Sequence, residues 1–430
     1  MHTPKTPDAT HLLSALQTRS PQTAAELAQR LGKSQPTLSR LLRELATEVV
    51  VLGQGKATVY ALPQPLLGLP ARQVLHWVHA DGRIEAWGEI TAVPGGKVHV
   101  RAEGISALFD GLPWFLTPLR PSGFLGRALA QQLAPQGFAS NPELWSLEQV
   151  LFAATLLPDS PGAVQLGQPQ TPALPLPVLA NDANLDALAM AAAATLPAGS
   201  SAGGEQAKFL ACDNLGQAVL VKFSPPRGTP FGERWHDLLV AEHLALCVLA
   251  EHGVAVAPSR LVHTASRSYL VSQRFDRVGP SGRRHVVALD AFHTAFVGGP
   301  RQHWAATCTA LARQRRVPAE TPAQAQALLH FGQLIGNTDM HFGNLSLWVE
   351  TADVAAGRGR LAPVYDMLPM RWRPDVYGGD FGLGAFEPDA MAMQSAARPL
   401  ARVFWARCAN GTILSAEFRR LAERMWQILG

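Results

Sequence analysis

Apolar residues recur at helical spacing in the first part of the chain, over 11–16, 24–31 and 34–45. Thr23 and Glu26 form a capping-box sequence, which marks the start of the second of these helices. Strand-like alternation follows on both sides of a glycine-containing turn and predicts a β-hairpin. Three helices followed by a hairpin predict a winged helix–turn–helix.

This N-terminal unit, residues 1–63, is expected to bind DNA. Residues 1–60 hold seven Lys or Arg against four Asp or Glu, a net charge of +3. A helix lying in the major groove presents polar side chains to bases and basic side chains to phosphates. The candidate DNA-binding residues are Gln35, Thr37, Ser39, Arg40 and Arg43 on the third helix, and Lys56 in the hairpin turn. The alternative is a small helical adaptor with a solvated polar face.

Residues 64–180 are expected to form a mixed subdomain and a linker. Alternating patterns predict strands over 82–90 and 97–101, and apolar spacing predicts helices near 125–133 and 144–156. The aromatic residues after 110 are not interleaved with Lys or Arg, which favours a core role over base stacking. Residues 158–177 are rich in Pro, Gly and Gln without a periodic pattern, which predicts a loop or linker.

Residues 181–430 are expected to form the catalytic domain. An alanine-rich helix is predicted over 182–194. The later pattern predicts a strand over 217–223 and a helix over 235–249, and a mostly helical remainder with helices over 323–334, 397–409 and 414–429.

The composition changes this picture little. The chain of 430 residues is 47% hydrophobic and 16% charged, which favours buried cores over disorder. Its four cysteines are far apart and show no metal-ligand spacing, which is typical of reduced thiols in a cytoplasmic protein. We expect neither a signal peptide nor a membrane-spanning segment, and therefore no membrane partner.

The candidate chemistry lies in a polar loop before an apolar segment. Asp339 and Asn344 are five residues apart, the spacing of the protein-kinase catalytic loop, in which the Asp receives a hydroxyl proton and the Asn holds magnesium. Residues 361–366 are predicted to be a short strand that ends in Asp366, a second carboxylate for metal binding. The alternative for such an Asn- and Asp-rich run is an ordinary turn.

A lysine and a glutamate upstream fit the same chemistry. Lys222 lies in a predicted strand, and Glu242 lies among leucines on the following helix. A carboxylate on that face needs a partner, and Lys222 would complete the kinase Lys–Glu ion pair. A strand lysine is otherwise usually a solvated residue.

Four blocks, in this order along the chain, resemble the HipA-type serine/threonine kinases, the toxin kinases of bacterial toxin–antitoxin systems. The first is an S-x-x-G-x-Q-x-K phosphate loop, with Ser201, Gly204, Gln206 and Lys208 in register, and the second spans 219–242 with Lys222 and Glu242. The third is the hinge over 271–277, and the last begins Gly336-Asn337-x-Asp339-x-His341-x-x-Asn344-x-Ser346 and ends at Tyr365-Asp366. With a fused winged helix, the chain is similar to members of the YjjJ type.

The resemblance implies an α+β fold, a winged helix–turn–helix followed by a two-lobed, protein-kinase-like domain with a mostly helical C-lobe. It implies ATP and Mg²⁺ as cofactors and Ser201 as an autophosphorylation site. Asp339 would be the general base, and Asn344 and Asp366 would hold the metal. ATP would be bound by Gly204, Gln206, Lys208, Lys222, Glu242, Gln273 and Phe275.

We therefore expect an ATP- and magnesium-dependent serine/threonine protein kinase that autophosphorylates and regulates its own transcription. Its expected partners are operator DNA, a protein substrate such as the aminoacyl-tRNA synthetases that family members modify, and an antitoxin or a second copy of the chain. Two positions depart from the family pattern: Gly343 stands where Lys is usual, and Gln273 where Glu is common. The alternatives are a transcription regulator that senses nucleotide without phosphorylating, and a small-molecule kinase.

Overall fold

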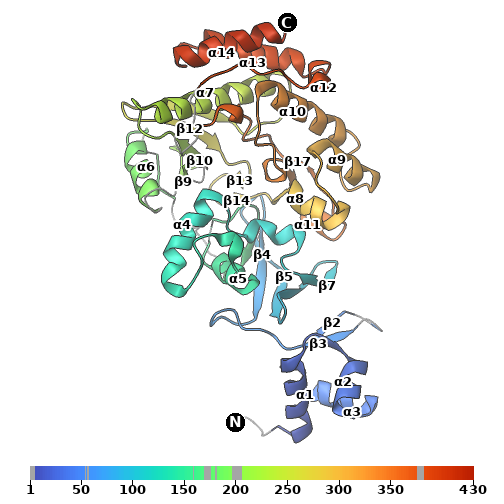
Figure 1. Ribbon diagram of the computed structural model, residues 1–430. Helices are drawn as coiled ribbons and strands as arrows, with labels where there is room; N and C mark the ends of the chain where they lie inside the picture. The colour runs from blue at the N-terminus through green and yellow to red at the C-terminus, as the bar shows by residue number, and fades with distance from the viewer. Residues whose placement is uncertain are drawn as a thin grey trace.

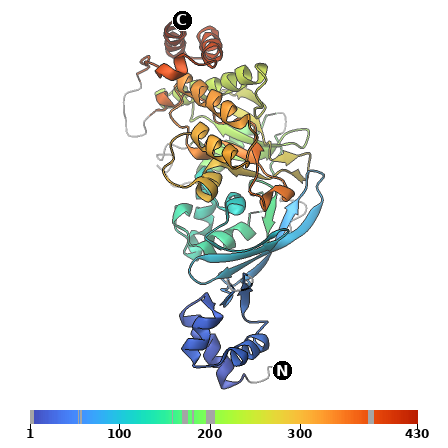
Figure 2. The same ribbon diagram turned by 90° about the vertical axis from the view of Figure 1, so that its right-hand side faces the viewer.

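Figure 1 shows the computed structural model as an elongated molecule, with the N-terminal unit at one end and the C-terminal helices at the other. The structure describes residues 5–53, 55, 58–157, 159–168, 176–179, 182–195, 206–374 and 382–430. Seen from the side in Figure 2, the middle sheet lies between the N-terminal unit and the rest of the chain. Strands β9 (Lys208–Cys212) and β10 (Ala218–Phe223), which carry Lys208 and Lys222, are therefore far from helix α3 (Gln35–Glu44).

The helices and the hairpin predicted for the N-terminal unit are present. They are α1 (Pro7–Thr18), α2 (Ala24–Leu31), α3 (Gln35–Glu44), β2 (Val50–Leu52) and β3 (Val59–Ala61), with the short β1 (Gln22–Thr23) pairing to β3 in a sheet of order β1-β3-β2. Both halves of the Thr23–Glu26 capping box form. The apolar stripes of the three helices meet in one core that includes Leu12, Leu16, Leu27, Leu38 and Leu41.

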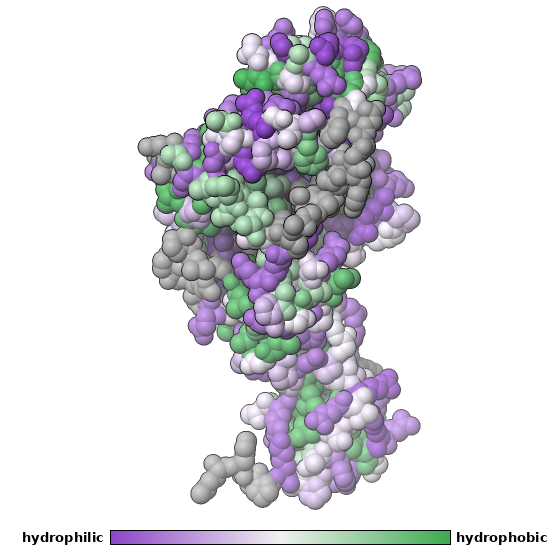
Figure 3. Space-filling model, turned by 60° about the vertical axis from the view of Figure 1, so that its left-hand side comes forward, coloured by the Kyte–Doolittle hydropathy of each residue, from purple (hydrophilic) through white to green (hydrophobic). Residues whose placement is uncertain are grey.

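A small apolar contact joins this unit to the next one. Val50, Leu52 and Ala61 of the hairpin pack against Val93 and Leu108 of the middle sheet. Figure 3 shows the corresponding narrow waist in the molecular surface.

The middle sheet is antiparallel, in the order β7-β6-β5-β4-β8. Its strands are β4 (Arg72–Val78), β5 (Ile84–Val93), β6 (Lys97–Ala102), β7 (Ile105–Asp110) and β8 (Val164–Leu166), and its helices are α4 (Gly123–Leu133) and α5 (Leu147–Thr155). The predicted strands and helices of this region are confirmed. Trp77, Trp87 and Phe115 pack edge to face, with ring centroids 5.3 and 5.9 Å apart, so these aromatic residues are core residues.

The prediction that residues 158–177 are only a loop or linker was wrong for part of the segment. Val164–Leu166 form β8, which pairs with Leu75, His76 and Trp77 of β4. Each residue of β8 is buried. Three residues are too few to show a period, so the sequence carried no signal for this strand.

The first part of the catalytic region is a second antiparallel sheet, of order β11-β12-β10-β9. It consists of β9 (Lys208–Cys212), β10 (Ala218–Phe223), β11 (Ser259–His263) and β12 (Ser268–Gln273), with α6 (Leu185–Ala194) and the long α7 (Pro230–Glu251) packed against it. Helix α7 begins five residues before the predicted start at 235, because Thr229 caps it and Pro230 suits its first turn.

The remaining chain is mostly helical. Its helices are α8 (Leu289–Phe292), the π-helical turn η6 (His293–Val297), α9 (Trp304–Arg313), α10 (Thr321–Ile335), α11 (Thr351–Val354), α12 (Ala390–Met393), α13 (Arg398–Asn410) and α14 (Ala416–Ile428). Short strands complete it, namely β13 (Arg277–Val278), β14 (Gly282–Arg283), β15 (Val286–Ala288), β16 (Ser346–Trp348) and β17 (Arg360–Leu361). Among the helices of the described residues, none is both long and apolar enough to cross a membrane.

The strand predicted over 361–366 is only partly present. Strand β17 ends at Leu361, and Pro363, which has no N–H to donate, interrupts the pairing with β16. Val364 instead donates its N–H to the carbonyl oxygen of Ala255 at 2.9 Å. Asp366 therefore lies after an irregular segment and not at the end of a regular strand.

Candidate active site

Strand β10 and helix α7 place a lysine and a glutamate in direct contact. The ammonium of Lys222 donates to both carboxylate oxygens of Glu242, at 2.7 and 2.9 Å, and the predicted pairing of these two residues is present. Lys222 also donates to the carboxylate of Asp366, which comes from a segment 144 positions later in the chain. Lys222 is 5% exposed and Glu242 is 2% exposed, so both charges are removed from water.

The charges of this triad shift its pKa values in a consistent way. Burial opposes the charged form of Lys222, but the carboxylates of Asp366 and Glu242 outweigh it and raise the lysine's pKa. Burial likewise opposes ionised Asp366, but the charges of Lys222 and Lys208 lower its pKa to about 2. For Glu242, burial exceeds the attraction of Lys222 and raises the pKa. At neutral pH the site therefore holds a charged Lys222 against an ionised Asp366.

Asp366 adopts an unusual backbone conformation. Its φ is +54°, in the left-handed region that residues with a side chain rarely occupy. The carbonyl oxygen of Asp366 accepts a hydrogen bond from Asn337 Nδ2 at 3.4 Å. A backbone strain of this kind costs on the order of 1–3 kcal/mol and is found mostly where the surrounding structure imposes it. Here it directs the carboxylate toward Lys222.

The loop that follows α10 is closed by its own polar side chains. Asn337 Oδ1 accepts from the N–H of Asp339 at 3.0 Å, and Asn344 Nδ2 donates to the carbonyl oxygen of Asp339 at 2.7 Å. The N–H of Gly343 donates to His341 Nδ1 at 3.0 Å. Asp339 and Asn344, which the sequence paired by spacing alone, are thus held at opposite ends of one hydrogen-bonded loop.

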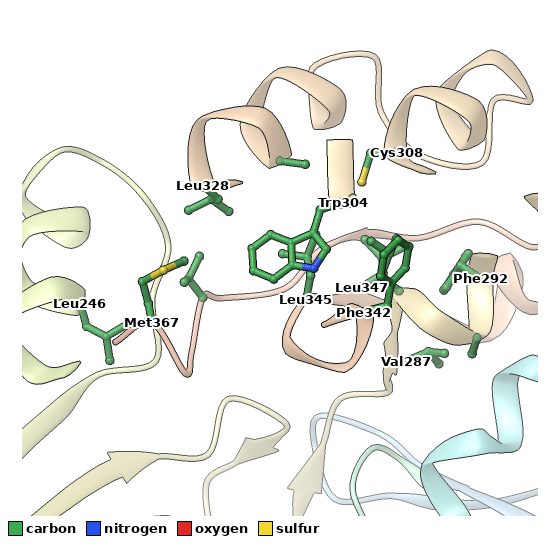
Figure 4. Packing of buried hydrophobic residues seen from close by; sticks show 14 of the residues in the cluster. Leu246, Val287, Phe292, Trp304, Cys308, Leu328, Phe342, Leu345, Leu347 and Met367 are labelled. Carbon is green, nitrogen blue, oxygen red and sulfur yellow. The ribbon is translucent and has the colours of Figure 1, made fainter. Parts of the chain in front are cut away.

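Apolar residues fix this loop to the core below it. Figure 4 shows Phe342 and Leu345 beside the indole of Trp304, with Leu347 nearby. Trp304 Nε1 also donates to the carbonyl oxygen of His341 at 3.1 Å. The loop is therefore anchored on its inner side, where Asn337 and Asn344 are also buried, while Asp339 and His341 are exposed.

Asp339 is accessible from outside the protein. Its side chain is 49% exposed, and the nearest oxygen lies 4.0 Å from His341 Nε2, whose side chain is 60% exposed. The structure also explains Gly343, because a Cβ at this position would lie 2.7 Å from the His341 ring. A lysine in place of Gly343 would require His341 to move.

The phosphate loop predicted from the sequence is described only in its second half. Ser201 and Gly204 lie outside the described residues. Gln206 Nε2 donates to the carbonyl oxygen of Phe223 at 2.6 Å, and its Oε1 is buried without a hydrogen-bond partner among the described residues. Lys208 faces Lys222 across β9 and β10 as its register partner. An anion bound beside this pair would be attracted by two lysine side chains.

The hinge residues lie at the edge of the same site. The N–H of Gln273 donates to Pro258 at 2.8 Å, and its side-chain amide donates to Gln217 at 2.5 Å, so the protein already uses both groups. The ring of Phe275 lies 5.5 Å from the rings of both Trp348 and Tyr365.

The sequence did not reveal the roles of Asn337 and Tyr365. The hydroxyl of Tyr365 donates to the carbonyl oxygen of Gly343 at 2.6 Å and lies 2.7 Å from Ser346 Oγ. Both residues belong to the quoted motif, but motif spacing does not tell which side chains bond to which backbone groups.

The predicted metal ligands have the chemistry that magnesium requires. Asn344 uses its Nδ2 within the loop, which leaves Oδ1 for a cation, and Asp366 supplies a carboxylate. Within the described residues, His, Cys, Asp and Glu form no group of three that would hold a metal by itself. Magnesium typically takes one or two protein oxygens and completes its shell with phosphate and water, so this donor set fits it.

The predicted DNA-binding residues lie on the exposed face of α3. Gln35, Ser39, Arg40 and Arg43 are exposed, and Thr37 is half-buried with its hydroxyl 2.9 Å from that of Ser34. Lys56 lies outside the described residues.

Comparisons with known families give matches over most of the chain. Residues 200–429 match the HipA-like C-terminal domain, and residues 69–173 match the middle domain of YjjJ-like toxins. The chain is 37% identical over 434 residues to Toxin YjjJ of Escherichia coli (strain K12), and the match covers 96% of each protein.

Two examples come from the solved structures that are similar to this chain. One is Shewanella oneidensis MR-1 HipA, solved with HipB and its operator DNA, with a TM-score of 0.50 and 16% identity over 83% of this chain and 95% of that chain. This similarity shows a shared fold. The other is the Helicobacter pylori proinflammatory kinase CtkA, at 12% identity over 52% of this chain and 89% of that chain, with a TM-score of 0.35. That value is too low to carry an argument.

Proposed function

Since the chain belongs to the family of HipA-like toxins and has a middle domain of the YjjJ-like type, we propose that it is an ATP- and magnesium-dependent serine/threonine protein kinase with its own DNA-binding domain. The observation that carries the proposal is that Lys222 bonds both Glu242 and Asp366. In protein kinases a Lys–Glu pair and a metal-binding Asp must both be in place for phosphoryl transfer.

Each residue of the site has a role in this reaction. Asp339, half exposed at the end of the loop, accepts the proton of a serine or threonine hydroxyl. Lys222, held by Glu242, contacts phosphate oxygens, and Lys208 and Gln206 line the approach to them. Asn344 and Asp366 would hold the magnesium ion. Bound magnesium would offset the charge of the triphosphate.

We further propose three domains, over residues 1–63, 64–180 and 181–430. The first would be a winged helix–turn–helix in which α3 reads the major groove, because its exposed face carries Gln35, Ser39, Arg40 and Arg43. The HipA relative was solved with HipB and operator DNA, which supports DNA as a partner here and an antitoxin or second copy as another. We place this activity in the cytoplasm, with an aminoacyl-tRNA synthetase as the candidate class of substrate.

A second candidate function is a regulator that binds nucleotide without transferring phosphate. Gly343 favours it, because this chain lacks the cation that the family usually places there, and the exposed Asp339 and the Lys222–Asp366 contact favour the kinase.

Incubating the purified protein with γ-labelled ATP and Mg²⁺ separates the candidates. Label on the protein, mapped to Ser201 by peptide analysis, supports the kinase. ATP binding without any transfer supports the nucleotide sensor. Label appearing only on added small molecules supports a small-molecule kinase, and absence of both binding and transfer would refute the proposal.

A further inference from the structure

Segment 159–162, which precedes strand β8 of the middle domain, forms hydrogen bonds and ion pairs with the residues on both sides of Phe275. Asp159 Oδ1 accepts from Arg277 Nε at 3.1 Å and from Arg277 Nη2 at 2.6 Å, and Asp159 Oδ2 accepts from Arg274 Nη1. Asp159 lies more than 110 positions before these arginines, in a stretch that the sequence marked as a linker. The contact therefore joins two parts of the chain that are remote in sequence.

The arginines are held by a second carboxylate and by backbone groups. Asp276 accepts from Arg274 at 3.0 and 2.9 Å, from Arg277 at 2.7 Å and from the N–H of Gly162 at 3.0 Å. Arg277 also donates to the carbonyl oxygen of Ser160 at 2.8 Å. Segment 159–162 thus bonds the hinge through side chains and backbone alike.

This cluster is removed from water. The side chains of Arg274, Asp276 and Arg277 are 8–9% exposed, and that of Asp159 is 15% exposed. Solvent screens buried ion pairs much less than exposed ones, and removing one partner leaves an uncompensated charge. Loss of the Asp159 carboxylate would therefore leave Arg274 and Arg277 with Asp276 as the one carboxylate that bonds them among the described residues.

Arg274 and Asp276, which Asp159 and Gly162 bond, are the immediate neighbours of Phe275, which contacts the candidate active site. Phe275 stands between Arg274 and Asp276, and its ring lies 5.5 Å from Tyr365, with an angle of 33° between the ring planes. Tyr365 precedes Asp366 and donates to the carbonyl oxygen of Gly343. A contiguous set of contacts therefore runs from Asp159 through Phe275 and Tyr365 to the loop that holds Asn344.

We propose that Asp159 is a positioning residue of the nucleotide site, through which the middle domain sets the hinge and the place of Phe275 against Tyr365. The inference rests on the proposed ATP binding. It makes the middle domain part of the nucleotide site rather than a spacer between DNA-binding and catalytic parts. If the cluster only stabilised the contact between the two domains, its loss would lower the free energy of unfolding without changing the affinity for ATP.

The test compares full-length variants by calorimetric titration with ATP and Mg²⁺, together with KM and kcat of label transfer. Asp159→Asn should weaken ATP binding and raise KM about tenfold or more, because small displacements of positioning groups are costly. It should change kcat much less, because Asp339 and the metal ligands remain. Asp159→Glu, which restores the carboxylate, should recover most of the affinity. The matched control is Asp110→Asn, an 84% exposed aspartate of the same domain, which should bind ATP like the wild type.

The outcomes separate this inference from the proposed function. A wild-type protein that does not bind ATP overturns both. Wild-type binding together with a folded Asp159→Asn variant of equal affinity overturns the inference alone. Should Asp159→Asn fail to fold, the variant Arg277→Lys provides the test, because it keeps the positive charge but loses the two-nitrogen contact to Asp159. Weaker ATP binding by Arg277→Lys supports the inference, and unchanged ATP binding overturns it.

Discussion

The hydroxyl of Tyr365 donates a hydrogen bond to the carbonyl oxygen of Gly343, 22 positions earlier, at 2.6 Å. This bond ties the residue before Asp366 to the residue before Asn344. The two proposed metal ligands come from different segments, so their relative position depends on such a connection. Tyr365 thereby links the two halves of the site.

Tyr365→Phe should lower both stability and activity. The substitution leaves the Gly343 carbonyl and the Ser346 hydroxyl without a buried partner, which costs about 1–3 kcal/mol in the free energy of unfolding. We expect label transfer to slow on the order of tenfold, since a metal ligand would shift. Urea unfolding and transfer assays measure the two effects. Tyr60→Phe in the N-terminal unit is the control, and an unimpaired Tyr365→Phe would contradict this role.

Glu242→Gln should weaken ATP binding while the protein still folds. The amide retains an acceptor for Lys222 but removes the charge that holds the ammonium in place, and about 1–3 kcal/mol of stability should be lost. Calorimetric titration with ATP and Mg²⁺ measures the affinity. The matched control on the same helix is Glu251→Gln, whose exposed pair with Arg407 should matter little. Equal affinities for the two variants would argue against the Lys222–Glu242 assignment.

His285 should make the stability depend on pH. It is buried, accepts from the N–H of Ala163 at 3.2 Å and donates to the Phe115 carbonyl at 2.8 Å, so it is neutral in the folded protein. Burial lowers the pKa of His285 from 6.5 to about 4. Between these values the unfolded chain binds the proton and the folded protein does not, so stability falls as the pH decreases through this window, by about 3 kcal/mol.

Urea unfolding at several pH values measures this dependence. His285→Gln should be less stable than the wild type at pH 7 and should lose less stability between pH 6.5 and 4. His11→Gln on the exposed side of α1 controls for the substitution. A pH profile unchanged by His285→Gln would show that other groups carry the dependence.

Arg40 and Arg43 should contribute to DNA binding through phosphate contacts. The logarithm of the binding constant falls linearly with the logarithm of salt concentration, by about 0.9 for each phosphate contact. The double variant Arg40→Ala with Arg43→Ala should therefore reduce that slope by about 2. Fluorescence anisotropy with a labelled mixed-sequence duplex measures it on the full-length protein. The control is Arg19→Ala, which changes an arginine of the same unit outside α3. A salt-dependence slope equal to that of the wild type in the double variant would show that α3 does not contact DNA phosphates.

Local patterns in the sequence predicted most of the elements because these depend on short-range signals. The Thr23–Glu26 capping box and the leucine stripe of α3 are examples, and both have the predicted structure. The closeness of Asp339 and Asn344 was also readable, since the two residues lie in one loop. The Lys222–Glu242 pair could be inferred because a buried carboxylate requires a cation.

Long-range contacts could not be read in this way. Asp159 contacts Arg274 and Arg277, which lie more than 110 positions later, and no spacing rule connects positions so far apart. The strand β8 was too short to show a period. Tyr365 stood in the motif, but its bond to Gly343 joins two segments 22 positions apart, which motif spacing does not reveal.

The most direct test of the central claim is the rate of label transfer from γ-labelled ATP, in the presence of Mg²⁺, by Asp339→Asn and by Asp290→Asn. Both aspartate side chains are 49% exposed, so the second variant controls for the substitution. We predict that Asp339→Asn loses on the order of 10²–10⁴-fold in rate while ATP affinity is kept, and that Asp290→Asn matches the wild type. Equal transfer rates in the two variants, or no transfer by the wild-type protein, would contradict the account.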